Sequence, residues 1–99
     1  MPTPRFTFTK FNDPGHGWLM VKISKLEQLG IADKISSCSY RMNDVAFLEE
    51  DCDASLFYKA MKQSGLTRGV DYEVVQRHTN NYSDIRNYRH YHYDVKVEA

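Results

Sequence analysis

The sequence predicts an α+β fold: a mostly antiparallel sheet of five or six strands, one main helix (about 52–64) and one short helix (about 25–29). Several short segments alternate apolar and polar side chains, as half-buried strands do. Turn-forming residues separate these segments, which favours hairpins. Only one segment has a sustained 3.6-residue apolar period, so helices and strands do not alternate one for one.

The first two predicted strands form a hairpin. Residues 5–10 alternate apolar and polar side chains, with threonines that favour extended backbone. Residues 12–17 combine Asn, Asp, Pro and Gly, which are the residues that turns require. Residues 18–23 then resume the apolar pattern. We therefore expect a hairpin whose loop is longer than two residues.

A short helix and a second hairpin follow. The helix is predicted to end at Gly30, because glycine adopts the left-handed conformation that terminates helices. Residues 38–42 and 45–48 flank Asn43-Asp44, a pair that tolerates positive φ. The sequence predicts a tight two-residue turn there, and its second strand leads directly into the main helix.

The main helix is predicted from one apolar stripe and its flanking residues. Asp51 or Asp53 can cap the first turn, and Gly65 ends the helix. Lys59 and Lys62 lie off the stripe and face water. The residues predicted to face the core are Cys52, Leu56, Phe57, Ala60 and Met61.

The C-terminal part of the chain predicts two further strands. Residues 72–77 form the first. Tyr91, Tyr93, Val95 and Val97 then alternate with polar residues, a period of two. We expect residues 89–97 to be an ordered strand at a sheet edge, where a second copy of the chain can pair to form a homodimer.

Composition limits the function classes. The chain has 99 residues, which suits a single domain over 1–99, and its 13 acidic and 13 basic side chains cancel. No global field therefore draws it to nucleic acid or an anionic membrane. No apolar segment approaches the length of a membrane span, and the N-terminus lacks a signal-peptide core. The two cysteines have neither metal-ligand nor redox spacing, so we expect them reduced and buried, and the protein cytoplasmic.

Two polar groups are candidate sites. His16 lies between two glycines beside Trp18, where it can bind a ligand, although a tight turn also explains the glycines. His90 and His92 share one strand face, with His78 or His16 as further metal ligands. A solvated strand face is the favoured explanation of these histidines, so no metal or cofactor is predicted. We assign no catalytic residue.

An acidic group and a basic group lie apart in the sequence. The acidic residues are explained by their position at the start of a helix, where carboxylates are stabilising. The alternative explanations are a cation site or an acidic patch that binds a basic partner. These are Glu49, Glu50, Asp51 and Asp53. The basic group mixes arginine with tyrosine, as protein-interface hot spots and single-strand nucleic-acid platforms both do. Its members are Arg77, Arg86, Tyr88, Arg89 and Tyr91. Three arginines are few for nucleic acid and the net charge is zero, so a protein interface or a plain sheet surface is favoured.

One set of short motifs resembles a known group of proteins. The motifs are Gly-His-Gly-Trp-Leu at 15–19, Leu-Gly-Ile at 29–31, Ile-Ser at 35–36, Ser-Tyr at 39–40, Phe-Leu-Glu-Glu-Asp-Cys-Asp at 47–53, Ile-Arg at 85–86, Arg89 and Tyr91. They resemble small uncharacterised proteins of bacteria, bacteriophages and mobile elements. The resemblance implies a phage or mobile-element accessory protein, a class that includes inhibitors of host defence.

Three functions remain open from the sequence. The first is a small non-enzymatic interaction protein that binds and modulates a host protein. The second is a nucleic-acid-binding protein that uses the Arg-, Tyr- and His-rich C-terminal region. The third is a small metal-dependent enzyme. We expect a protein partner and no membrane association.

Overall fold

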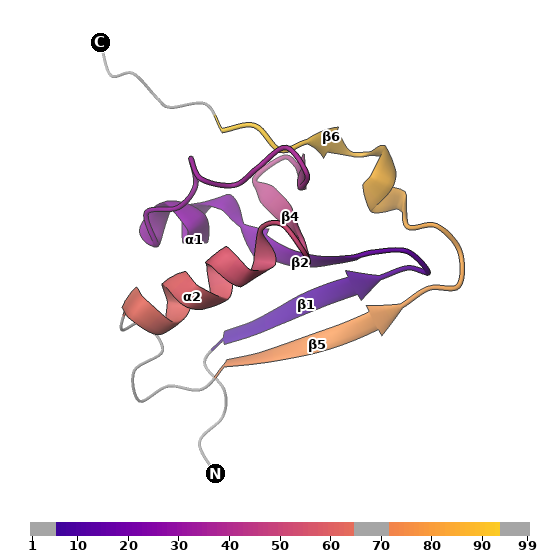
Figure 1. The fold of residues 1–99 in the computed structure, drawn as a ribbon, viewed down its shortest axis with the longest axis horizontal. Coiled ribbons are helices and arrows are strands. Elements are labelled where there is room, and N and C mark those ends of the chain that lie inside the picture. Colours follow the sequence, from indigo (N-terminus) through magenta and orange to yellow (C-terminus); the bar gives the residue numbers. More distant parts are fainter. Residues whose placement is uncertain (1–5, 65–71, 94–99) are drawn as a thin grey trace.

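The computed structural model describes residues 6–64 and 72–93 (Figure 1). Its strands are β1 (Phe6–Asn12), β2 (Gly17–Lys22), β3 (Tyr40–Met42), β4 (Val45–Glu49), β5 (Tyr72–His78) and β6 (Arg89–His90). Its helices are α1 (Ile23–Gln28) and α2 (Ala54–Ser64), and η1 (Asp84–Asn87) is a 3-10 turn. The predicted α+β class, with one main and one short helix, is confirmed.

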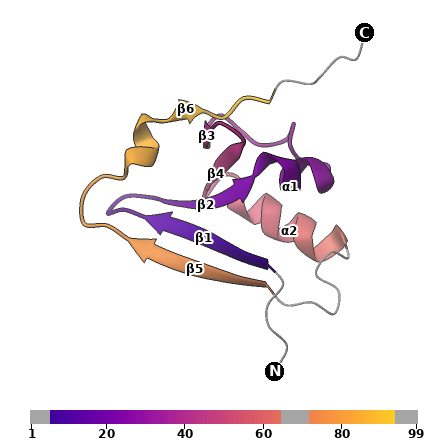
Figure 2. The ribbon, with the colours of Figure 1, turned by 180° about the vertical axis from the view of Figure 1, so that it is seen from behind.

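The described strands form one mixed sheet with the order β5-β1-β2-β4-β3-β6. Each neighbouring pair is antiparallel except β1 and β5, which run parallel. That pair arises because the chain leaves β4 through α2 and returns on the far side of β1 (Figures 1 and 2). The sheet is therefore mostly antiparallel, as predicted.

Both predicted hairpins are confirmed. In the first, Asn12 of β1 lies opposite Gly17 of β2, so residues 13–16 form the loop. In the second, Met42 of β3 lies opposite Val45 of β4, which leaves a two-residue turn. Asn43 in this turn has φ of 55°, a left-handed conformation that asparagine tolerates better than most residues.

The two helices pack on one face of the sheet and form the main core with it. Phe57 of α2 is fully buried, and its ring meets that of Phe8 edge to face at 5.1 Å between centroids. The core residues of the inner strands and helices are Leu19, Val21, Ile23, Leu26, Ala46, Leu48, Ala54, Phe57 and Met61. The apolar stripe predicted for the main helix therefore faces inward at Phe57 and Met61, and Leu56 is half-buried at its margin.

Helix α2 begins two residues later than predicted. The Asp53 amide donates to the Glu49 carbonyl, and the Glu49 carboxylate accepts the amides of Asp51 and Cys52, at 2.9 Å in each case. Residues 50–53 therefore form a turn ahead of the helix. The expectation that Cys52 lies on the buried stripe is wrong, because in this turn its side chain is exposed.

Helix α1 follows β2 without a loop, and so it begins at Ile23 rather than near residue 25. The Ile23 amide donates to the Asp44 carbonyl at 2.8 Å, which fixes this junction to the β3–β4 turn. The predicted end at Gly30 is confirmed: Gly30 has φ of 74°. Its amide donates to the Glu27 carbonyl, and the Ile31 amide donates to that of Leu26, as in a Schellman motif.

The C-terminal strand is shorter than predicted. β6 contains only Arg89 and His90, and it lies at the edge of the sheet beside β3. Tyr91 to Tyr93 are not part of the strand, although the Tyr91 amide still donates to the Ser39 carbonyl at 2.8 Å and the Tyr91 hydroxyl donates to the Ala32 carbonyl at 2.5 Å. The remainder of the predicted strand, with Val95 and Val97, lies outside the described residues. None of the described helices is long and apolar enough to cross a membrane.

The main core predicts a large effect of truncating its central side chain. Phe57→Ala should lower the free energy of unfolding by about 3–5 kcal/mol, because it leaves a cavity between α2 and the sheet. Chemical denaturation followed by circular dichroism measures this value. Lys59→Ala, on the exposed side of the same helix, is the control and should change it by less than about 0.5 kcal/mol. A loss below about 1 kcal/mol for Phe57→Ala would contradict the described packing.

Candidate functional site

The sheet face opposite the helices carries apolar and aromatic side chains from all six strands. The strand registers define two neighbouring rows on this face, which we call the open face. The first row is Val75, Thr9, Met20, Phe47, Tyr40 and His90. The second row is Arg77, Phe11, Trp18 and Glu49.

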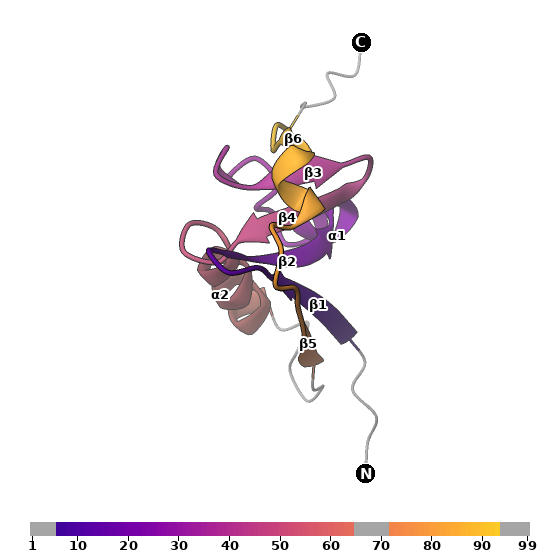
Figure 3. The ribbon, with the colours of Figure 1, turned by 90° about the vertical axis from the view of Figure 1, so that its right-hand side faces the viewer.

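The connection from β5 to β6, residues 79–88, lies over part of the open face. Ile85 of η1 is buried there and packs with Trp18 and Phe47 in a second apolar cluster. The ring of Tyr88 lies 5.2 Å from that of Phe47. Figure 3 views the molecule from the side on which η1 lies and shows the connection rising from β5 to β6. This connection therefore forms one wall of any site on the open face.

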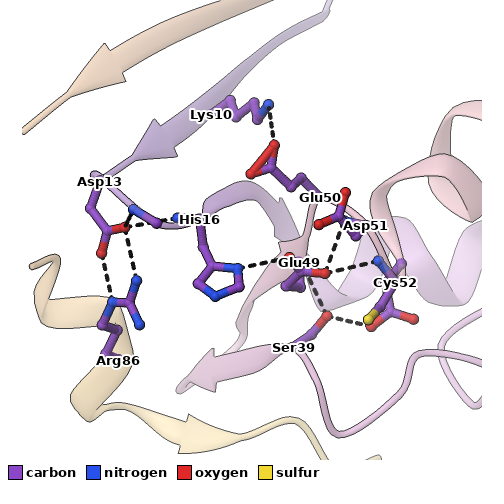
Figure 4. Close-up of polar contacts among 11 residues, drawn as sticks. Lys10, Asp13, His16, Ser39, Glu49, Glu50, Asp51, Cys52 and Arg86 are labelled. Atoms are coloured by element: carbon purple, nitrogen blue, oxygen red, sulfur yellow. Dashed lines mark hydrogen bonds and ion pairs between the residues drawn. The ribbon is translucent and has the colours of Figure 1, made fainter.

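An ion pair between Asp13 and Arg86 fastens this connection to the β1–β2 loop (Figure 4). Arg86 Nε lies 2.6 Å from Asp13 Oδ2, and Nη2 lies 2.9 Å from Oδ1. The amides of Gly15, His16 and Ser83 donate to the same carboxylate at 2.9 to 3.0 Å. The Asp13 side chain is fully buried, and these five donors replace its lost hydration.

The surroundings of Asp13 favour its charged form. Hydrogen bonds from the Arg86 guanidinium hold the pKa of Asp13 well below its ordinary value. Burial acts in the opposite direction, and hydrogen bonds from the amides of Ser83, His16 and Gly15 lower the pKa further. The pKa of Arg86 is raised, chiefly by its hydrogen bonds to Asp13. Both groups therefore stay charged over the physiological pH range.

Arg86 also contacts two aromatic rings. Its guanidinium carbon lies 5.3 Å from the centroid of Trp18 and 4.8 Å from that of Tyr82, within cation–π distance. A Cβ atom at Gly15 would lie 3.0 Å from Arg86 Nη2, so the glycine allows the close approach of the loop. Trp18 and Arg86, predicted as binding residues, therefore hold the connection in place, and Trp18 is 2% exposed.

His16 joins this loop to the end of β4. Its Nδ1 lies 3.3 Å from Glu49 Oε1, and its ring is 5.9 Å from that of Trp18. Burial acts to raise the pKa of Glu49, but hydrogen bonds from the Cys52 thiol and from the amides of Asp51 and Cys52 keep it below its ordinary value. His16 remains exposed on its other side, at the rim of the open face.

The acidic residues do not form one exposed patch. Glu49 and Asp53 are buried, and Glu50 pairs with Lys10 at 3.4 Å. The Asp53 carboxylate accepts hydrogen bonds from the Ser36 amide and from the hydroxyls of Ser36 and Ser39. Asp51 alone of the four is exposed. Glu49, Glu50 and Asp53 therefore each have a partner within the fold, which leaves little acidic surface for a basic partner.

Both cysteines are exposed and free, so the expectation that they are buried is wrong. The cause lies in their backbone: each sits in a turn held by a neighbouring side chain. Ser36 accepts the Cys38 amide, and Glu49 accepts that of Cys52. Hydrogen bonds with the Cys38 thiol and the Glu49 carboxylate raise the pKa of Cys52 to about 12. Cys52 is therefore a weak nucleophile at neutral pH.

Two hollows share the lining residue Tyr88, one on the open face and one at the β3–β6 edge of the sheet. The first has a volume of about 590 Å³ and lies between the sheet and residues 79–88. Its floor is apolar, and Tyr82 at its rim is 76% exposed. The side chains that form the floor and the inner wall are Phe11, Met20, Phe47, Ile85 and Tyr88.

The second hollow, of about 410 Å³, lies at the β3–β6 edge. Met42 lines it and is 51% exposed. Its basic lining side chains are Arg41, Arg89, His90 and His92, and no carboxylate is among its described lining residues. Arg41 donates to the carbonyls of Asn43 and His92, whereas His90 stacks on Tyr40 at 4.8 Å between centroids. An apolar hollow and a basic hollow thus have Tyr88 in common.

The predicted binding residues are only partly brought together. Tyr88 and Arg89 line the hollows, whereas Tyr91 is buried in the main core. Arg77 lies on β5, at the opposite sheet edge from Arg89 on β6. The predicted histidine cluster does not form among the described residues, where no group of three metal-ligating side chains occurs. His90 Nδ1 instead lies 2.8 Å from the Ser37 carbonyl oxygen.

Sequence reasoning missed most of the apolar floor. Phe11, Met20 and Phe47 were assigned only to strands, because alternation separates two faces without indicating which face helices cover. The signal that could have found them is the aromatic content of the second face, which exceeds what a solvated sheet face needs.

Comparison with protein-family models, curated proteins and solved structures finds no match to the chain. The resemblance noted from the sequence therefore stays a hypothesis. The function proposed below rests on the geometry of the open face and the two hollows.

The Asp13–Arg86 pair predicts a specific pH dependence of stability. The pKa of Asp13 is lowered by folding, so its stabilising contribution is complete above its unfolded value near 4 and is lost as the pH falls below it. Between pH 6 and pH 3, the free energy of urea unfolding should therefore fall more for the wild type than for Asp13→Asn. Asp84→Asn, at an exposed position of η1, is the control and should lose as much as the wild type does. Equal losses in all three proteins would contradict the assigned role.

Proposed function

We propose that the protein is a small non-enzymatic interaction protein of the cytoplasm that binds a protein partner through the open face. The observation that carries this proposal is that an apolar hollow and a basic hollow share Tyr88 as a lining residue. Protein interfaces have this composition, in which aromatic and arginine side chains contribute most of the binding energy.

The two hollows specify the chemistry of the partner. The first accepts an apolar or aromatic side chain, which would displace water from the floor formed by Phe11, Met20 and Phe47. The second attracts carboxylates, because two arginines and two histidines line it and no carboxylate is among its described lining residues. The expected partner surface therefore presents an apolar anchor with acidic residues beside it.

The rigid wall formed by residues 79–88 is a second argument for a binding site on the open face. The Asp13–Arg86 pair fixes residues 79–88 before any partner binds, so less conformational entropy is lost on association. Tyr82 and Met42 remain largely exposed at the two ends of the site. Exposed apolar side chains next to preformed hollows are typical of interaction surfaces.

Nucleic acid is less well supported as the ligand. Of the three arginines considered for that role, Arg86 is paired with Asp13, and Arg77 and Arg89 lie at opposite edges of the sheet. The net charge of zero supplies no general attraction to phosphate.

As the biological setting we propose a phage or mobile element, in line with the sequence resemblance. In that setting the partner is a host protein, and binding would modulate it. Inhibition of a host defence protein is one form that such modulation takes.

Affinity capture from host lysate tests the proposal. The wild type and Lys59→Glu, a charge reversal on the helix side, should capture the same protein after nuclease treatment. Tyr82→Ala and Arg89→Glu each alter one hollow and should reduce that capture about ten-fold, the effect of losing one interface anchor.

Two results would contradict the proposal. Capture that is equal for all four proteins would exclude the open face as the binding surface. Capture that disappears with nuclease, or that weakens steeply with salt, would indicate nucleic acid instead.

A further inference from the structure

Strand β5 has a long free edge. It contains seven residues, pairs with β1 on one side, and has no described strand on the other (Figures 1 and 2). The opposite edge strand, β6, has only two residues. Edge strands usually carry prolines, bulges or inward-pointing charges that prevent pairing, and β5 (Tyr-Glu-Val-Val-Gln-Arg-His) has no proline. It pairs with β1 residue for residue over its whole length, without a bulge.

The hydrogen bonding of β5 identifies which backbone groups are free. The Thr79 amide donates to the Asn12 carbonyl of β1 at 2.9 Å. Because the amide and carbonyl of a strand residue point to the same side and alternate along the chain, residues 73, 75 and 77 also face β1. The groups that point away from β1 belong to Tyr72, Val74, Gln76 and His78.

The sequence of β5 is complementary to itself when two copies run antiparallel. Pairing centred on Val75 places Glu73 of one copy opposite Arg77 of the other, on both sides of the centre. Val75 meets its own counterpart, and it is 41% exposed in one copy. Neither Glu73 nor Arg77 has an ion-pair partner among the described residues, and both are exposed.

This register also agrees with the free backbone groups. Val74 and Gln76 become a hydrogen-bonded pair, as do Tyr72 and His78, so the outward amides and carbonyls are all used. The Val75 pair and the two Glu73–Arg77 pairs then occupy non-hydrogen-bonded positions, where opposite side chains approach most closely. Backbone, apolar and charge complementarity therefore select one register.

We infer that the protein forms a two-fold symmetric homodimer in which the β5 strands of two copies pair antiparallel about Val75. The net charge of zero imposes no general repulsion between the copies. Opposite residues in a sheet project to the same side, so both open faces lie on one side of the continuous sheet. This self-association does not depend on the partner proposed above.

Charge reversal tests the register. Light scattering from micromolar to near-millimolar protein should show a concentration-dependent dimer for the wild type. Glu73→Arg and Arg77→Glu each place like charges opposite one another twice and should raise the dimer dissociation constant about ten-fold or more. The double variant Glu73→Arg/Arg77→Glu restores opposite charges and should regain wild-type dimerisation.

A second variant tests the backbone pairing. Gln76→Pro removes an amide that points away from β1, so it should abolish the dimer and leave the circular dichroism spectrum of the monomer intact. Gln76→Ala keeps the amide and should remain dimeric. A wild type that is monomeric at all concentrations, a double variant as weak as the single ones, or a dimeric Gln76→Pro protein would each overturn the inference.

Discussion

The ion pair between Asp13 and Arg86 is the interaction on which the open face depends. Residues 79–88 contribute one buried apolar residue, Ile85, and the partly buried Tyr88 to the second cluster. The buried Asp13 carboxylate requires donors, and it receives them from Arg86, from its own loop and from Ser83. Because an unpaired buried charge is costly, loop and connection are fixed together, and the wall of the apolar hollow is fixed with them.

The elements set by local sequence could be predicted, and those set by distant contacts could not. Gly30 and the Asn43-Asp44 turn determine their own conformations, and both appear as expected. The parallel pairing of β5 with β1 has no local signal, because it depends on where the chain returns after α2. The early start of α1 depends likewise on the distant Asp44 carbonyl. Alternation at 91–93 predicted a strand, and Tyr91 is buried in the main core as that pattern requires, but the pairing with β3 includes only Arg89 and His90.

The candidate site shows the same division. Arg86 and Trp18 were predicted as binding residues, yet their contacts join parts of the chain more than sixty residues apart, and spacing could not reveal that they contact each other. The acidic run was noticed for its charge, but two of its carboxylates are buried acceptors for turn amides and serine hydroxyls. Phe11, Met20 and Phe47 attracted no attention, because ordinary strand residues become a binding floor only when helices cover the opposite face.

Hydrogen exchange on Arg86→Gln tests most directly whether the ion pair holds the connection over the open face. The amides of Ser83, Ile85, Arg86 and Tyr88 all donate hydrogen bonds in the described structure. They should exchange slowly in the wild type and much faster in the variant, while the amides shared by β2 and β4 stay protected in both. Unchanged exchange over residues 83–88 in a folded Arg86→Gln protein would contradict the account.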